Sequence, residues 1–276
     1  TVSSELYKDK DITLGYVSTD EAVQLSATLP TTAVFAENDI SPQMIMWDPA
    51  TYPKVKTIKD LAATLKANGG VVRYFQGAAY LQGSGILPVA QTDGAYDGSP
   101  AKFVTAKGKD GQQGFATAEP YIYQNEVSAW GKPLSFQLIH DTGYPIYPEA
   151  MSVRSADLSK LSPCLTKLVP VLQQADVDYI SKPAMTNKLV ADLVTAFNNG
   201  WVYSEKVAEF GVSQMKKLKI ASNGSNAYVG DFDETRVQKV IDIDTPLFTA
   251  SGSAPKAGLK ATDLFTNEFL SKSIGF

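Results

Sequence analysis

The sequence predicts an α/β protein with mostly parallel sheets, and three observations carry the prediction. Short apolar runs alternate along the chain with helix-like segments, which is the order of βαβ units. The apolar runs lack polar–apolar alternation, as is typical of strands covered on both faces. Helix-start and turn residues separate the two kinds of segment, so the order of elements follows from the sequence.

The N-terminal part of the chain predicts three short strands and one helix. The apolar runs at 12–17, 31–36 and 42–47 are expected to be the strands. The polar run from Ser18 to Asp20 is expected to cap a helix that starts near Glu21, with acidic residues at the positive end of the helix dipole.

The middle of the chain continues the alternation of strands and helices. Thr57 with Asp60 is a capping-box pattern, and Gly69 is a typical helix end, so a helix is expected between them. The strand "VVRYF" then turns at Gly77 into another helix. Further strands and helices are expected in "GAYDGSPAKFVTAKG", "QGFATAEPYIYQNE" and "PLSFQLIHD".

The C-terminal part, to about Ile241, is expected to be mainly helical. Pro163 and Pro170 are expected to interrupt the helices, because proline lacks the amide that a helix interior needs. The tail after Phe248 opens with small residues and predicts a linker that leads to a short terminal helix.

Composition excludes several classes of function. The net charge is −4, which gives no basic patch for nucleic acid or for an anionic membrane surface. Cys164 is the single cysteine, so no internal disulfide forms, and a buried, inert thiol is expected there. No apolar run approaches the roughly 20 residues of a membrane span. The polar start "TVSSELYKDKD" is not a leader sequence, so a leader is either removed or was never present.

The sequence predicts no catalytic residue, no metal site and no cofactor. His140 is the single histidine, and its separation from Cys164 does not match the spacing of metal ligands. The carboxylates in "GDFDETR" and "QQADVD" are expected on solvated helix faces or at helix caps. Ser99 in "DGSPA" lacks the glycine pattern of a nucleophile elbow.

The positive signal is the placement of aromatic residues at the ends of predicted strands. Ligands of open α/β sheets bind beyond the carboxyl ends of the strands, and aromatic walls with a few polar groups are typical of a small-molecule cleft. Some of these rings are expected to be core residues instead. The residues are Trp47, Tyr74, Phe75, Tyr80, Tyr96, Phe115, Tyr121, Tyr123, Tyr144 and Tyr147.

At this point the order of motifs resembles a known family. The segments "WDPATYP", "VRYFQGAAY", "YDGSPAKF", "QGFATAEPYIY" and "GYPIYPEAMSVRSADL" together resemble solute-binding proteins of bacterial ABC importers. The nearest subfamily has the thiamine-precursor-synthase-like fold and includes binders of alkanesulfonates, nitrate, pyrimidine precursors and flavins.

The resemblance implies a two-lobed, hinge-linked type II periplasmic-binding-protein fold that closes on a solute. One lobe is expected to combine 1–56 with 144–276, and the other to comprise 57–143. The resemblance places the ligand-binding residues at Thr19, Asp20, Trp47, Asp48, Tyr74, Gln76, Gly77, Tyr80, Ser99, Phe115, Thr117, Glu119, Tyr144 and Tyr147.

Two departures from the family pattern affect the expected function. Family members begin with two further βα units, which are expected to be missing here. Binders of small anions need positive charge, whereas the expected cleft contains Arg73 at best beside Asp20, Asp48 and Glu119. A neutral or cationic ring-bearing solute therefore fits better, such as a pyrimidine-type vitamin precursor or a flavin.

The resemblance implies a monomeric, periplasmic or lipid-anchored protein that delivers its solute to a membrane permease. An enzyme that makes a thiamine pyrimidine is one alternative, but such enzymes need an iron site and a substrate histidine, and this chain has one His and one Cys. A solute-sensing regulatory domain is the second alternative. A purely structural interaction protein is the third, and the clustered aromatic residues argue against it.

Overall fold

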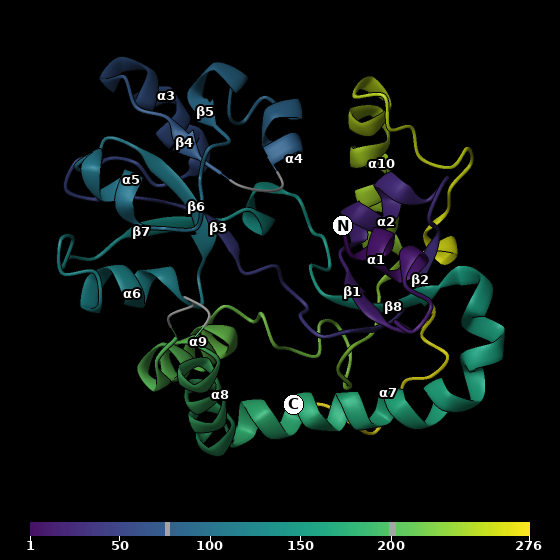
Figure 1. Cartoon of the computed structure of the whole chain (residues 1–276). Coiled ribbons are helices and arrows are strands. Elements are labelled where there is room, and N and C mark those ends of the chain that lie inside the picture. Colours follow the sequence, from purple (N-terminus) through teal and green to yellow (C-terminus); the bar gives the residue numbers. More distant parts are fainter. Residues whose placement is uncertain (75–77, 199–202) are drawn as a thin grey trace. The chain divides into compact units, whose positions relative to one another are not determined.

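The computed structural model describes residues 1–74, 78–198 and 203–276, and the chain forms two compact units (Figure 1). Unit 1 comprises Thr1–Ser41, Pro145–Pro183 and Lys216–Phe276. Unit 2 comprises Pro42–Tyr144 and Ala184–Met215. Each unit contains its own β-sheet.

The units differ from the lobes expected at 1–56 with 144–276 and at 57–143. Strand β3 (Gln43–Trp47) lies between β6 and β7 in the sheet of unit 2, so it cannot belong to unit 1. Helices α8 and α9 also pack with unit 2, where Ser204 Oγ donates to Glu126 Oε1 at 2.6 Å. These are long-range contacts that local patterns do not contain.

The sheet of unit 1 has three strands in the order β1-β8-β2, and both pairings are antiparallel. The prediction of a mostly parallel sheet is therefore wrong for this unit. Continuous burial of β2 shows that both faces are covered, but it carries no information on strand direction. The elements of unit 1 are α1 (Val2–Lys8), β1 (Gly15–Val17), α2 (Thr19–Leu25), β2 (Thr31–Ala36), β8 (Ala150–Arg154), α7 (Leu158–Ser181) and α10 (Glu234–Ala250).

Helices cover both faces of this sheet (Figure 1). Helix α7 packs on one face, where Leu165 and Val169 join Val34, Phe35 and Val153 in a buried apolar cluster. Helices α2 and α10 pack against each other over the other face. The sheet is thus the middle layer of a three-layer unit.

Helix α7 is continuous over 24 residues and contains both Pro163 and Pro170, so the expected interruptions are wrong. Each proline removes one amide donor from the helix, and tertiary packing of the apolar face maintains the helix across both positions. Cys164 in this helix is exposed rather than buried. The last helical element is a short 3₁₀ turn at Ala261–Asp263 instead of the expected terminal helix.

Gly230 gives a test of the core of unit 1. Its φ is +94°, and a Cβ atom at this position would lie 2.4 Å from two ring carbons of Phe35, which is 2% exposed. Gly230→Ala is expected to lower the free energy of unfolding by about 3 kcal/mol, because left-handed strain and overpacking add. Urea denaturation measures the loss.

Gly258 provides the matched control for this substitution. Its φ is +68°, but no atom lies within 4 Å of the position of a Cβ. Gly258→Ala is therefore expected to lose only the strain energy, about 1 kcal/mol. Equal losses in the two variants would mean that the contact with Phe35 costs nothing.

The sheet of unit 2 has five strands in the order β5-β4-β6-β3-β7 and is mixed. Strand β4 is parallel to β5 and β6, whereas β3 is antiparallel to both of its neighbours. The elements are β3, α3 (Ile58–Asn68), β4 (Val72–Arg73), α4 (Ala78–Gly83), β5 (Thr92–Asp93), α5 (Ala101–Thr105), β6 (Gly111–Phe115), α6 (Glu119–Asn125), β7 (Ser135–Leu138), α8 (Ala184–Phe197) and α9 (Glu205–Lys217).

Locally encoded elements of the sequence are confirmed. Thr57 caps α3 by accepting from the Asp60 amide, the Asp60 carboxylate accepts from the Thr57 amide, and the helix ends at Gly69 with φ +66°. Strands β2 and β3 lie where the apolar runs predict them.

Candidate functional site

Four strands of unit 2 end at one edge of the five-stranded sheet. Strands β4, β5 and β6 are parallel, and β7 shares their direction because both β6 and β7 are antiparallel to β3. We call this the carboxyl edge of unit 2. The described segments that leave it contain most of the expected ligand-binding residues of this unit, namely Tyr74, Tyr80, Ser99, Phe115, Thr117, Glu119 and Tyr144.

The turn from β6 to α6 is built around Glu119. Its Oε2 accepts a 2.7 Å hydrogen bond from the Phe115 amide. Gly114 provides the space, because a Cβ there would lie 3.0 Å from Glu119 Cδ. Burial raises the pKa of the Glu119 carboxyl, although the hydrogen bond from Phe115 acts in the opposite direction.

Thr117 lies in the same turn, and helix α9 packs against this turn. A Cβ on Gly211 of α9 would lie 3.1 Å from the Thr117 carbonyl oxygen. The rings of Tyr121 on α6 and Phe210 on α9 lie 5.6 Å apart. Helix α9 therefore supports the turn that carries Glu119.

A buried polar group lies on the same face of β6 as Gly114. Gln112, which is 0% exposed, donates from Nε2 to the Tyr123 hydroxyl at 2.6 Å. Its Oε1 is buried and accepts no hydrogen bond among the residues that the structure describes. Burial is the main cause that raises the pKa of Tyr96, and the charge of the Glu119 carboxylate adds to it.

Two of the expected tyrosines stack on each other. The ring centroids of Tyr80 and Tyr144 lie 4.1 Å apart, with an angle of 5° between the planes. Tyr80 donates from its hydroxyl to the Thr142 carbonyl at 2.9 Å. Each side chain is less than a tenth exposed, so these rings form a wall behind the carboxyl edge.

Tyr74 and Ser99 lie in the segments that follow β4 and β5. Tyr74 is half-buried, and its amide donates to the Asp93 carbonyl at 3.0 Å. The Ser99 amide donates to Asp97 Oδ1 at 2.9 Å, just before α5. The expected site residues Gln76 and Gly77, and the aromatic Phe75, lie outside the described residues.

The structure separates Trp47 and Asp48 from this group. In the antiparallel register, Gln43 pairs with Phe115 and Met46 with Gln112, so β3 ends at the opposite edge of the sheet. Lys132 Nζ forms a 2.7 Å ion pair with Asp48, and Ala50 and Thr51 also donate to its carboxylate. Burial acts to raise the pKa of Asp48, but these bonds outweigh it and hold the pKa below its usual value.

The expected residues of unit 1 are engaged in its fold. The amide of Thr19 donates to the Tyr147 carbonyl at 3.0 Å, and the Tyr147 amide donates to Thr19 Oγ1 at 3.1 Å. The Tyr147 hydroxyl accepts from the Asp233 amide at 2.9 Å. Asp20 lies in the first turn of α2, where burial raises the pKa of its carboxyl.

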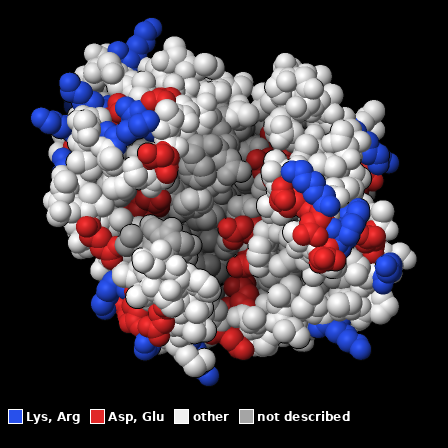
Figure 2. All heavy atoms as spheres, in the orientation of Figure 1, with Lys and Arg blue, Asp and Glu red and all other residues white. Residues whose placement is uncertain are grey.

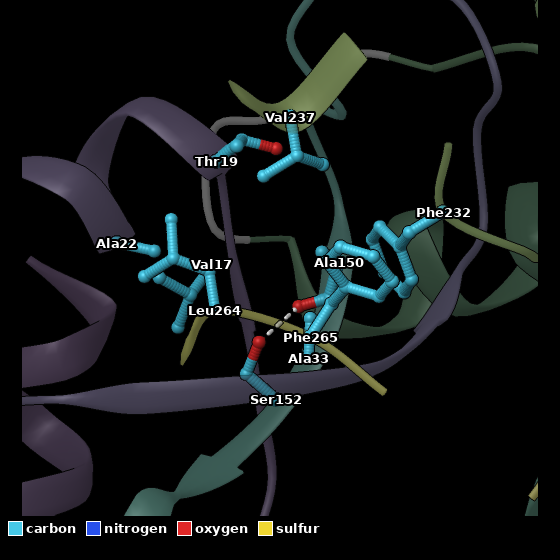
Figure 3. A pocket seen from close by; sticks show the side chains of 10 residues that line it. All are labelled: Val17, Thr19, Ala22, Ala33, Ala150, Ser152, Phe232, Val237, Leu264 and Phe265. Carbon is cyan, nitrogen blue, oxygen red and sulfur yellow. Dashed lines mark hydrogen bonds between the residues drawn. The ribbon is translucent and has the colours of Figure 1, made fainter. Parts of the chain in front are cut away.

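Figure 3 shows a small cavity in unit 1 that Thr19 helps to line. Its other walls are mainly apolar side chains of β1, β2, β8 and α10, and Ser152 turns its hydroxyl to the Ala150 carbonyl at 2.9 Å. The volume is about 10 Å³, which is the lower limit for a single water molecule. This cavity does not accommodate a ring-bearing solute.

Arg236 is a largely buried charge, with its side chain 16% exposed, that sequence reasoning missed. Its guanidinium donates to the Pro145 carbonyl at 2.7 Å and to Asp39 Oδ1 at 2.6 Å, and it lies 3.8 Å from the centroid of the Tyr147 ring. A depression of about 260 Å³ beside it is also lined by Asp231 and other acidic residues. On the face drawn in Figure 2, acidic side chains gather in several groups.

The described residues contain neither a metal-binding cluster nor a membrane-spanning helix. Within residues 1–74, 78–198 and 203–276, no group of three His, Cys, Asp or Glu side chains is placed to hold a metal ion. In that same part of the chain, no helix combines the length and the apolar character needed to cross a membrane.

Comparisons with known proteins place the fold. No protein-family model matches the chain, and no curated protein matches it in sequence. The alkanesulfonate-binding protein SsuA from Xanthomonas axonopodis pv. citri, solved with MOPS, matches with a TM-score of 0.59 at 14% identity, over 96% of this chain and 84% of that chain.

Two further solved structures are similar. The periplasmic aliphatic sulphonate binding protein SsuA from Escherichia coli gives a TM-score of 0.58 at 14% identity, over 92% of this chain and 75% of that chain. A putative periplasmic sulfonate-binding protein of an ABC transporter from Methylobacillus flagellatus KT gives 0.52 at 13% identity, over 98% and 76%. These likenesses show that the chain shares the fold of these sulfonate-binding proteins.

Proposed function

We propose that this protein is the extracytoplasmic solute-binding component of a bacterial ABC importer, periplasmic or lipid-anchored and monomeric. It captures a small ring-bearing nutrient, such as a pyrimidine-type vitamin precursor, a flavin or another aromatic compound, and delivers it to the permease. Binding and release require no bond to be made or broken. The fold shared with sulfonate-binding proteins supports the transport role.

The observation that carries the proposal is the carboxyl edge of unit 2. Four strands end there, and the segments beyond them carry Phe115, whose amide donates to the Glu119 carboxylate, and the stacked rings of Tyr80 and Tyr144. Ligands of open α/β sheets bind at such an edge. Aromatic side chains with a few polar groups suit a small ring-bearing molecule.

A thermal-shift screen of the purified chain tests the proposal. The panel contains riboflavin, thiamine, aromatic acids, alkanesulfonates and nitrate, because a ligand that binds only the native state raises the melting temperature. Stabilisation by one ring-bearing class is the expected result. A cooperative melt that no member of the panel shifts would contradict binding of a ring-bearing nutrient.

Phe115→Ala tests the position of the site. The half-buried ring follows Gly114 at the carboxyl edge, and its loss is expected to weaken binding of the stabilising ligand about tenfold, because one aromatic contact contributes about 1.5 kcal/mol. Isothermal titration calorimetry measures the affinity. Phe136→Ala is the control, because Phe136 pairs with Met46 further along the sheet. A tenfold loss in the control alone would move the site away from this edge.

A further inference from the structure

The positive side chains near the carboxyl edge of unit 2 are already neutralised or bonded. Arg73 contacts Asp93 at 2.5 Å and Asp110 at 2.7 Å. Lys102 Nζ donates to the Ala95 carbonyl, and His140 has an interaction of its own within the chain. An anionic solute at this edge would have to displace one of these contacts.

The hydrogen-bond acceptors at the same edge can accept further donors. The Glu119 carboxylate accepts from the Phe115 amide at Oε2 and also from its own amide, but no described Lys or Arg forms an ion pair with it. Gln112 Oε1, three residues before the end of β6, is also buried without a donor in the described residues. Buried acceptors of this kind cost free energy until a donor reaches them, so the edge favours a ligand that brings N–H groups.

Two tyrosine hydroxyls lie within the electrostatic range of the Glu119 carboxylate. The Glu119 charge acts on both Tyr96 and Tyr123 and raises the pKa of each hydroxyl, although burial is the larger cause. Tyr123 also receives the Gln112 amide at 2.6 Å. A carboxylate that no cation neutralises attracts positive charge, and any ring face that a bound cation reaches adds to the attraction.

We propose that the solute bound at the carboxyl edge of unit 2 carries a cationic nitrogen and that Glu119 is its counter-charge, an assignment that rests on the proposed solute-binding function. The solute class is a protonated amine or a cationic nitrogen heterocycle attached to an aromatic ring. A sulfonate placed there is repelled by the Glu119 carboxylate. The described Arg and Lys side chains of the edge, Arg73 and Lys102, already bond to other groups of the chain. This chain therefore differs in charge preference from the sulfonate-binding proteins that share its fold.

Three probes of similar size and different charge test the assignment. Benzylamine, benzyl alcohol and benzenesulfonate are titrated against the full chain at pH 7.5 by calorimetry. Benzylamine, protonated at this pH, is expected to bind at least tenfold more tightly than benzyl alcohol, and benzenesulfonate is expected not to bind. Binding of benzenesulfonate as tight as that of benzylamine would overturn the cationic assignment and leave solute binding intact.

Variants test the role of Glu119 itself. Glu119→Gln keeps an oxygen that can accept from the Phe115 amide, so the turn is expected to remain folded, and benzylamine affinity is expected to fall at least tenfold. Glu209→Gln, an exposed glutamate on α9 of the same unit that pairs with Lys206, is expected to change nothing. Unchanged benzylamine affinity in Glu119→Gln would refute the counter-charge.

The two hypotheses fail separately. If riboflavin or another neutral ring stabilises the chain and benzylamine does not bind, the cationic assignment is wrong, but the proposed function as an importer component is retained. If neither these probes nor the wider panel bind to a chain that melts cooperatively, the proposed function for a ring-bearing solute falls together with the assignment.

Discussion

Arg236→Ala is expected to destabilise unit 1 by about 3–5 kcal/mol, the usual cost of removing one partner from a buried ion pair. The guanidinium donates to the carbonyls of Pro145 at 2.7 Å and Ile146 at 3.0 Å and to Asp39 Oδ1 at 2.6 Å. It also stacks on Tyr147. The variant leaves a largely buried carboxylate and several carbonyls without a donor, so the loss exceeds that of a surface ion pair.

Two variants sharpen the test of Arg236. Arg236→Lys keeps the charge but not the planar fork, so it is expected to recover less than half of the loss. Lys239→Ala removes an exposed cation from the same helix and is expected to stay within about 0.5 kcal/mol of the parent chain. Chemical denaturation measures all three. An Arg236→Ala variant as stable as Lys239→Ala would show that the network contributes no net stability.

Local signals in the sequence predicted the elements that depend on local chemistry. Thr57 and Asp60 formed their capping box, and the run from Thr31 to Ala36 became a strand. The segments expected near a ligand, around Ser99 and Phe115, follow strands that share one edge. Backbone hydrogen bonding and capping are decided within a few residues, which is why these predictions were possible.

Properties that depend on residues distant in the sequence could not be predicted from local sequence patterns. Trp47 ends a strand, but β3 runs against β6, so its end lies at the opposite edge from Phe115. Pro163 and Pro170 lie inside a helix that the core of unit 1 holds together. Arg236 lies in an ordinary helical segment, and only its distant partner Asp39 shows that it is buried. The buried polar residue Gln112 could have been noticed in the sequence, because two adjacent glutamines inside a short strand are unusual.

The second large effect is expected from Asp176, which changes how stability depends on pH. Burial of its side chain determines the direction of this change. This side chain of α7 is 9% exposed, and Oδ2 has no partner in the described part of the chain. Burial, with a smaller contribution from Glu37, raises the pKa of Asp176 from 3.8 to about 7. Tyr16 and Glu149 are the other titratable groups near it, since the charges of Glu37, Glu149 and Asp176 all act on Tyr16.

Because the pKa is higher in the folded state, the folded chain holds one more proton than the unfolded chain between about pH 4 and pH 7. The contribution of Asp176 to stability is therefore fully present below pH 4, falls as the pH rises, and is lost above pH 7. Two pH units within this window correspond to about 3 kcal/mol. Asp176→Asn has no proton to lose, so its stability at pH 8 is expected to exceed that of the parent chain, reduced by any cost of a buried amide.

The measurement is urea denaturation at pH 5 and pH 8 of the parent chain, Asp176→Asn and Asp178→Asn. Other carboxylates titrate in all three, so the difference between chains isolates Asp176. Between the two pH values, Asp176→Asn is expected to lose about 3 kcal/mol less than the parent, whereas Asp178→Asn, at an exposed position on the same helix, is expected to follow the parent. Parallel pH profiles for all three chains would mean that Asp176 is ionised in the folded state throughout this range, and that a cation neutralises the buried carboxylate or water solvates it.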